Sequence, residues 1–260
     1  MITQVWQWLT SASSWQGSEG IAHRIVQHLE YSVITVLIAS LIAIPLGMWI
    51  GHTGRGRSMV TAANSLRAVP SLGLLFAVAL WLGPKLHGSS AFVVPSIVVL
   101  VVLAIPPLLA GAYAGVAGVD PAARDAAHGM GMTGGQVLLQ VETPCALPLM
   151  LSGVRSAMLQ VIATATIASA VSLGGLGRFL IDGLALGNYQ VMAGGAIVVA
   201  VLALLVDGVL AALQLVVVSP GLSGGGSRLR GRSILTDRGT RAPTENEPEA
   251  AGVATNDQLA

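Results

Sequence analysis

Residues that could carry out catalysis are few and scattered in this sequence. The five histidines lie far apart, and no HExxH, GxSxG or paired-carboxylate pattern surrounds them. Cys145 is the single cysteine, which excludes a disulfide framework and a cysteine metal site within one chain. The sequence contains no Gly-x4-Gly-Lys-Ser/Thr phosphate loop, and its Gly-x-Gly-x-x-Gly match at Gly129 lacks the preceding strand of a dinucleotide-binding fold. We therefore predict no catalytic residue, no metal site and no cofactor bound by this chain.

Three charges inside apolar runs form a second chemically unusual set. Arg67, Arg155 and Asp207 lie at similar expected depths, roughly 12 to 16 Å from one membrane face if their helices are ideal. Ionisable side chains are costly in hydrocarbon, so they usually face the interior of a helix bundle and form pairs. We expect Asp207 to pair with Arg155 or with Arg67. The alternative is that Arg67 extends to the membrane surface, or that its span begins later in the sequence.

The composition explains why these charges would be embedded in a membrane. Hydrophobic residues make up 53% of the 260 residues, charged residues make up only 10%, and the mean hydropathy is +0.76. A soluble protein of this length needs more charge to cover its surface, so a membrane protein is favoured. The net charge of +1 offers no basic surface to nucleic acid, and we expect no nucleic-acid partner.

Five apolar runs are long enough to cross the hydrocarbon, which takes about 20 residues of α-helix. They cover residues 31–50, 59–83, 92–115, 146–173 and 191–218. The second run is ambiguous because it contains Arg67 and Pro70. Prolines inside the other runs are tolerable where neighbouring helices or side chains bind the carbonyl groups that they free. The expected fold is all-α: a polytopic membrane protein with about five transmembrane helices.

The arginines and lysines near the span ends give the expected orientation. Seven of them would be cytoplasmic and three external if residues 120–144 lie in the cytoplasm. The N-terminus is then outside and the C-terminus inside. Residues 1–28 form an extracytoplasmic segment, either a helix at the membrane surface or a frayed end, and residues 29–218 form the transmembrane domain. Residues 219–260, rich in Gly, Ser, Pro and charge, form a disordered cytoplasmic tail.

Residues 120–144 are a polar, glycine-rich interruption between two apolar runs. Asp120 is followed by a proline, which fits the start of a helix, and Gly131 fits the end of that helix. Thr133 fits a capping box that starts a second helix, and Pro144 favours an end or a kink there. The expected structure is two short helices joined at a glycine corner on the cytoplasmic side. Because short helices are marginal in water, the pair either packs on the chain's own helix ends or docks into another protein.

This interruption resembles the EAA loop of permease subunits of binding-protein-dependent ABC importers. The family pattern is Glu-Ala-Ala, three residues, Gly, nine residues, Ile, any residue, Leu, Pro. Asp125-Ala126-Ala127, Gly131 and Val141-Glu142-Thr143-Pro144 match its spacing without a gap, with Asp for Glu, Val for Ile and Thr for Leu. The stretches AVPSLGLLF (68–76), AAHGMGMTGGQVLLQVETPCALPLMLSGVR (126–155) and ATIASAVSLGGLGRFLIDGL (165–184) are similar to permeases of osmoprotectant importers. The resemblance runs over roughly residues 25–222.

The resemblance implies a type I ABC importer permease core that neither binds nor hydrolyses ATP. The implied partners are cytoplasmic ATPase subunits, a second permease copy or paralogue, an extracytoplasmic substrate-binding protein and the lipid of the plasma membrane. The implied cargo is glycine betaine, carnitine, choline or proline betaine, with methionine or an aliphatic sulfonate as the alternative because related permeases share the loop. The implied ATPase-coupling residues are Asp125, Ala126, Ala127, His128, Gly131, Met132, Val141 and Pro144.

Polar residues within the spans are candidates for the path of the cargo. They are Asn64, Ser65, Ser71, Thr164, Thr166 and Ser169. Small hydroxyl residues also join membrane helices, which is the competing interpretation. Residues 172–190 are a candidate outer gate or docking segment for the binding protein, or a plain re-entrant loop. Two rival classes remain: a membrane-embedded enzyme, which would need a cluster of catalytic groups, and a passive channel, which would not need the pair of short helices.

Overall fold

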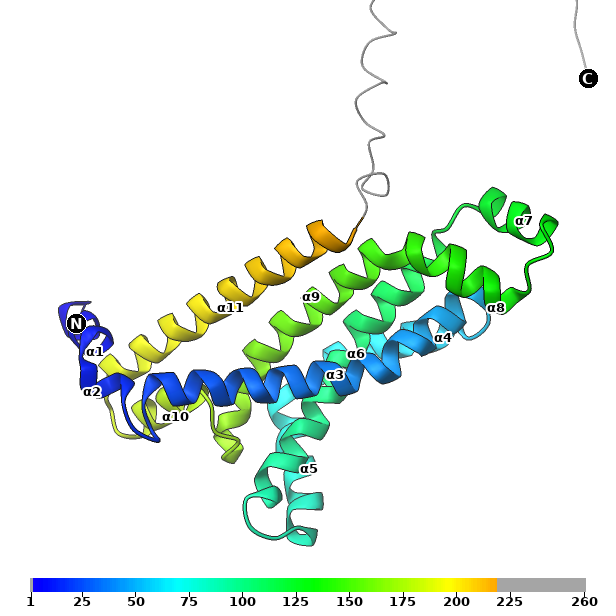
Figure 1. Ribbon diagram of the computed structural model, residues 1–260. Helices are drawn as coiled ribbons and strands as arrows, with labels where there is room; N and C mark the ends of the chain where they lie inside the picture. Colours follow the sequence, from blue (N-terminus) through cyan, green and yellow to red (C-terminus); the bar gives the residue numbers. More distant parts are fainter. Residues whose placement is uncertain (1, 219–260) are drawn as a thin grey trace, which may run out of the picture. The chain divides into compact units, whose positions relative to one another are not determined.

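The computed structural model describes residues 2–218, and this part of the chain is folded into helices without a strand (Figure 1). Four long helices are α3 (Ile21–Thr53), α6 (Ser90–Ala117), α9 (Thr143–Ala168) and α11 (Tyr189–Val217). The shorter elements are α1 (Ile2–Thr10), α2 (Ala12–Trp15), α4 (Arg57–Ser65), η1 (Leu66–Ala68), α5 (Ser71–Leu82), η2 (Gly83–Lys85), α7 (Pro121–Gly129), α8 (Gly134–Val137), η3 (Leu138–Glu142), η4 (Ser169–Val171) and α10 (Gly177–Ala185). The tail expected at residues 219–260 lies outside the described residues.

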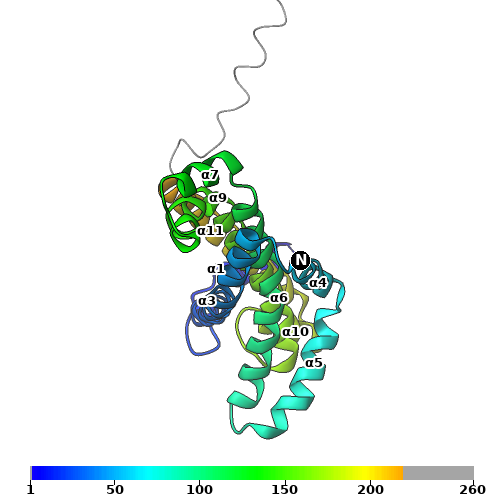
Figure 2. The same ribbon diagram turned by 90° about the vertical axis from the view of Figure 1, so that its right-hand side faces the viewer.

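Four helices are long and apolar enough to cross a membrane: α3, α6, α11 and the continuous helical stretch Gly134–Val171. Residues 59–83, the ambiguous run, do not form one straight helix. They lie in a bent pair, Arg57–Ala68 and Ser71–Lys85, whose axes differ by 94° (Figure 2). Val69 before Pro70 is extended, with φ −73° and ψ 128°, because a proline disfavours helical backbone in the residue before it. The described chain therefore has four spans, or five if the bent pair counts as one.

The first long helix begins earlier than the sequence predicts. α3 starts at Ile21, has 33 residues and is about 50 Å long, which exceeds the roughly 30 Å of hydrocarbon. The expected domain boundary at residue 28 therefore lies inside α3. Before it, α1 is a formed helix with Val5 buried, and Trp8 packs edge to face on Phe179 of α10, with ring centroids 5.3 Å apart.

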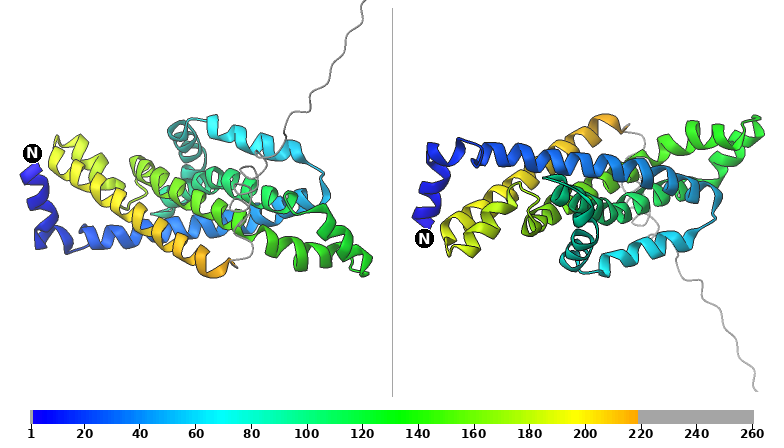
Figure 3. Two further views of the ribbon diagram at one scale, coloured as in Figure 1. Left: turned by 90° about the horizontal axis from the view of Figure 1, so that it is seen from above. Right: turned by 90° about the horizontal axis from the view of Figure 1, so that it is seen from below.

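The core lies where α3, α6 and α9 pack against one another (Figure 3). Small residues permit close contact between these helices. A Cβ atom on Gly111 of α6 would lie 2.9 Å from the Cα atom of Gly153 on α9, so the two backbones touch there. α11 is packed less tightly, and only 11% of the residues in its most apolar segment are buried. Its many exposed leucines and valines give it a surface suited to lipid.

At one of the prolines in α6, a neighbouring helix binds the freed carbonyl group, as the sequence analysis predicts. Pro107 has no N–H to donate to the carbonyl oxygen of Leu103, one helical turn earlier. The side-chain amide of Gln160 on α9 donates to this oxygen instead, over 2.8 Å. A neighbouring helix thus satisfies the carbonyl group that the proline frees.

The two ends of this bundle carry different elements. α7 and α8 lie at one end, beside the C-terminal end of α3, and α1, α2 and α10 lie at the other (Figure 1). We name these the α7 end and the α10 end. The residues with possible functional roles lie at both ends and along the core between them.

Candidate functional site

Local sequence signals determine where α7 and α8 begin. A carboxylate oxygen of Asp120 accepts a hydrogen bond from the backbone N–H of Ala122 over 2.9 Å, as expected of an N-cap. Gly131 ends the segment with φ +84°, a left-handed conformation that favours glycine. At the start of α8 the backbone N–H of Thr133 donates to Gln136 Oε1 over 2.8 Å, as in the predicted capping box. These three features confirm the predicted starts and the glycine corner.

The EAA-like residues of α7 lie mostly on its exposed face. Asp125, Ala126 and His128 are exposed, Ala127 is buried, and Met132 in the connection to α8 is half-buried. The Nδ1 atom of His128 lies 3.3 Å from the carbonyl oxygen of Met132, which closes the turn after the helix. The helix thus presents a carboxylate, an imidazole and a small alanine to its surroundings. Their contact with an ATPase remains a prediction.

The second short helix that the sequence predicts is not a separate element. α8 continues through the π-helical turn η3 directly into α9, so Pro144 lies in the first turn of α9 instead of ending a helix. Because the helix continues through this point, Pro144 leaves one carbonyl group of the preceding turn without its usual donor, and the wider π-helical turn accommodates this interruption. The wider turn is closed by Thr143, whose Oγ1 donates to the carbonyl oxygen of Leu138 over 2.7 Å. Val141 is half-buried in this turn, and Pro144 is exposed.

Glu142 lies in a buried cluster with Arg124 and His52 that the sequence does not predict. Its side chain is only 1% exposed, and its Oε2 lies 2.7 Å from Nδ1 of His52 in the last turn of α3. Its Oε1 lies 2.7 Å from Nε of Arg124 on α7. Arg124 also donates from its terminal guanidinium nitrogen to the carbonyl oxygen of Val116, at the end of α6. These contacts thus link α3, α6 and α7 to η3.

Two of the three charges expected inside the membrane form a pair. Arg155 of α9 donates from Nε to Oδ1 of Asp207 on α11, and from its terminal nitrogen to Oδ2 over 2.6 Å. Arg67 lies apart, exposed on η1, which packs against α4 and α6. Among residues 2–218 it makes no ion pair. Of the two pairings expected for Asp207, the structure has the one with Arg155, and Arg67, just before the bend at Pro70, lies outside the pair.

The candidates for the cargo path lie in two regions. Asn64 and Ser65 are exposed on α4 and Ser71 is half-buried at the start of α5, whereas Thr164 and Thr166 are half-buried on α9 and Ser169 is buried in η4. The hydroxyl groups of Thr164 and Thr166 donate to carbonyl oxygens of their own helix, over 2.7 and 3.1 Å. Ser169 Oγ donates to the carbonyl oxygen of Gly174 over 2.6 Å, which holds the next turn. The structure thus gives Ser169 a structural contact.

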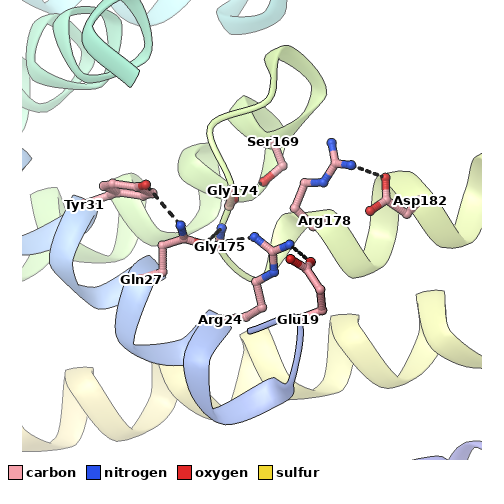
Figure 4. Close-up of polar contacts among 9 residues, drawn as sticks. All are labelled: Glu19, Arg24, Gln27, Tyr31, Ser169, Gly174, Gly175, Arg178 and Asp182. Carbon is pink, nitrogen blue, oxygen red and sulfur yellow. Dashed lines mark hydrogen bonds and ion pairs between the residues drawn. The ribbon is translucent and has the colours of Figure 1, made fainter. Parts of the chain in front are cut away.

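The turn after η4 is held against α3 (Figure 4). Ser172, Gly174 and Gly175 all have positive φ, at 69°, 90° and 71°. The backbone N–H of Gly175 donates to Oε1 of Gln27 over 2.8 Å. A Cβ atom on Gly174 would lie 2.8 Å from the same oxygen, so glycine is required there by space as well as by backbone conformation.

Charged side chains surround this turn and line an open pocket of about 410 Å³ at the α10 end. Arg24 pairs with Glu19 and donates to Oε1 of Gln27 over 3.0 Å. Arg178 of α10 pairs with Asp182 over 2.8 Å (Figure 4). Residues 172–190, expected as an outer gate, a docking segment or a re-entrant loop, therefore form a braced turn followed by α10.

Comparison with known proteins identifies the family of this chain. The family described as binding-protein-dependent transport system inner membrane component matches residues 43–218. The glycine betaine/carnitine/choline transport system permease protein of Bacillus subtilis (strain 168) is 33% identical over 207 residues, which cover 78% of this chain and 91% of that protein. The carnitine transport permease protein of Listeria monocytogenes is 35% identical over 189 residues, 72% of this chain and 84% of that protein.

A solved structure has the same fold. The MetNI methionine ABC transporter, crystallised in inward-facing conformations, contains a chain with a TM-score of 0.66 and 21% sequence identity. The similarity covers 76% of this chain and 96% of that one. This chain therefore has the fold of a type I ABC importer permease, and it belongs to the binding-protein-dependent transport system inner membrane components, multi-pass permease subunits of the plasma membrane.

Proposed function

We propose that this chain is the permease subunit of an ATP-driven importer of osmoprotectants such as glycine betaine, choline, carnitine and proline betaine. A separate ATPase hydrolyses ATP, a second permease completes the path, and an extracytoplasmic binding protein delivers the cargo. The observation that carries the proposal is α7, a separately capped helix whose EAA-like face is exposed. The relatives named for osmoprotectant transport supply the class of cargo.

The exposed face of α7 has the chemistry of a docking helix. Nine residues form a helix of marginal stability in water, so a partner surface would stabilise it. The carboxylate of Asp125 can accept hydrogen bonds from that partner, and the small side chain of Ala126 permits close approach of the two backbones. In this proposal, nucleotide-driven closure of two ATPase subunits displaces α7, and the spans alternate between inward-open and outward-open arrangements.

Cargo recognition would reside mainly in the separate binding protein. Tight binding of a quaternary ammonium group normally uses several aromatic side chains that surround the cation. This chain has only three Phe, three Tyr and five Trp, and several of the tryptophans lie near its N-terminus. The permease would then provide a path with little affinity of its own.

Uptake measurements test the cargo class. The permease is produced with its ATPase and binding protein in cells that lack other osmoprotectant importers, and labelled glycine betaine, choline, carnitine, proline betaine and methionine are supplied separately. We expect ATP-dependent uptake of at least one quaternary ammonium compound and none of methionine. Uptake of methionine alone would contradict the osmoprotectant proposal while leaving the importer mechanism in place.

A substitution on α7 tests the docking role. Asp125→Asn removes the negative charge and preserves the shape of the side chain. We expect ATPase co-purification and uptake to fall by about tenfold, the loss expected of one charge-assisted hydrogen bond. Glu30→Gln, which neutralises an exposed carboxylate on α3, is the matched control and should leave both unchanged. If the two variants have equal ATPase co-purification and equal uptake, Asp125 is not part of the docking surface.

A further inference from the structure

α7 is joined to the rest of the bundle by few contacts. It packs against α8 and η3, and Ala127 is its buried residue. Two short connections link it to the neighbouring helices, one from Gly118 to Asp120 and one from Met130 to Thr133. The second connection contains Gly131 at positive φ, a residue type with little conformational restriction. Backbone connections alone would therefore fix the direction of α7 poorly.

One carboxylate gives α7 a second attachment. One oxygen of Glu142 bonds to His52 at the end of α3, and the other lies 2.7 Å from Nε of Arg124 on α7, within ion-pair distance but outside hydrogen-bond geometry. Arg124 extends this attachment to α6 through the carbonyl oxygen of Val116. Glu142 of η3 therefore contacts α3 and α7 directly, and α6 through Arg124.

The burial of the Glu142 carboxylate suits it to fix the arrangement of the helices around it. Buried ion pairs often add little net stability compared with apolar residues of the same volume, but they tolerate few arrangements of their partners. Glu142 is 1% exposed, whereas the side chains of His52 and Arg124 are each 24% exposed. A movement of α7 that left Glu142 behind would separate Arg124 from a buried carboxylate. The movement that preserves the pair is one in which η3 and the ends of α3 and α6 follow α7.

We infer that Glu142 is a positioning residue that transmits displacement of α7 to α3 and α6. This inference rests on the proposed function, because α7 is driven only if an ATPase docks on it. Glu142 is buried, whereas Asp125 is exposed, so Glu142 acts through Arg124 and His52. Its loss should separate hydrolysis from transport without removing the ATPase from the complex.

The first test measures transport per ATP hydrolysed in the complete importer, reconstituted in proteoliposomes. Glu142→Gln keeps the shape of the side chain and removes its charge. We expect normal complex assembly and basal ATP hydrolysis, with solute transported per ATP reduced by about tenfold, within the range measured for residues that couple two sites. Arg124→Gln and His52→Gln should reduce the same ratio, and Glu30→Gln should not. Glu142→Asp, which keeps the charge on a shorter side chain, should recover part of the ratio.

A distance measurement tests the rigid attachment independently of cargo. Spin labels are attached at Ala122→Cys on α7 and Thr53→Cys at the end of α3, both exposed positions, in a chain carrying Cys145→Ser. We expect one narrow distance distribution in the wild-type background and a broad one with Glu142→Gln. Glu30→Gln should retain the narrow distribution.

The outcomes separate this inference from the proposed function. A narrow distribution in Glu142→Gln, or a transport-per-ATP ratio equal to that of the wild type, overturns the positioning role. A fall in uptake that only follows a fall in the amount of folded complex overturns it too, since the ratio is then unchanged. If the wild type transports none of the osmoprotectants, the cargo proposal fails, while the spin-label result still decides whether Glu142 fixes α7.

Discussion

The pair between Arg155 and Asp207 shows how one side-chain contact can orient a helix that packs loosely. α11 is the least buried of the long helices, and this bidentate contact joins it to α9. A second polar contact lies nearby, since the side-chain amide of Gln214 donates to the carbonyl oxygen of Pro148 over 3.2 Å. Apolar contacts with lipid do not fix rotation about a helix axis, whereas these two contacts do.

Removing both members of this pair should cost less than the sum of the two single removals. Asp207→Asn leaves Arg155 without its counter-ion, and Arg155→Gln leaves Asp207 alone, so each should lower the unfolding temperature of the purified protein. The double variant should lie closer to the wild type than the sum of the two single effects, because no charge remains uncompensated. Thermal unfolding in detergent measures all three variants. Asp182→Asn, in the exposed pair with Arg178, is the control. Strictly additive effects would show that the pair contributes no coupling.

The two ion pairs differed in how well the sequence predicted them. Asp207 lies in an apolar run, where an unpaired carboxylate is costly, so a partner could be expected. Glu142 lies in a polar loop, where a carboxylate is solvated by default, and its partner His52 is 90 residues away in sequence. Only the folded arrangement of helix ends brings them together. For the same reason Arg124 could equally have been a solvated charge.

The corner between the helices α7 and α8 depends on the glycine at position 131. Gly131 has φ +84°, and a Cβ atom there would meet nothing within 4 Å. Space is therefore available, and the restriction comes from the backbone alone. Gly129, two residues earlier in the last turn of α7, also has open space around it but lies in helical conformation.

Matched alanine substitutions at these glycines should have opposite effects. Gly131→Ala forces an L-residue into left-handed backbone and should lower stability by about 1 kcal/mol, with a loss of coupled uptake if α7 is displaced. Gly129→Ala should be neutral or stabilise α7 by up to about 1 kcal/mol, because alanine restricts the unfolded chain more than glycine does. Thermal unfolding and uptake of the two variants provide the comparison. A neutral Gly131→Ala would mean that the corner adopts another conformation at little cost.

The hydrophobic runs predicted the long helices, but not how their ends are built. Each run except the bent one at residues 59–83 gave a long helix, since a membrane leaves the backbone no other partner than itself. The start of α3 was missed because residues 21–30 contain His, Arg, Gln and Glu, which mark it as polar although it continues the same helix. Pro144 suggested a helix end, and the π-helical turn of η3 removed the need for one.

At the scale of the whole molecule, the direction of the chain across the membrane remains a prediction. The distribution of arginines and lysines favours a cytoplasmic α7 end and an external α10 end. The proposed function requires the same direction, because the ATPase and its nucleotide are cytoplasmic. A single measurement of side-chain accessibility therefore tests both the direction of the chain and the proposed function.

Labelling with a membrane-impermeant thiol reagent tests this direction. In a Cys145→Ser background, His128→Cys on α7 should react only after the cells are permeabilised, whereas Leu186→Cys after α10 should react in intact cells. Both positions are exposed, so access to the reagent depends on the side of the membrane. Reaction of the residue at 128 in intact cells would reverse the expected direction and exclude α7 as a site for a cytoplasmic ATPase.

The uninterrupted stretch from Gly134 to Val171 carries a mechanical consequence. It passes through the π-helical turn η3, where the helix changes direction, and α9 then runs 26 residues, about 39 Å, toward the braced glycine turn at the α10 end (Figure 1). If α9 tilts about its middle, its two tips swing in opposite senses. Narrowing at one face of the membrane and widening at the other would then be a single motion of one helix, with no relay of separate parts between them.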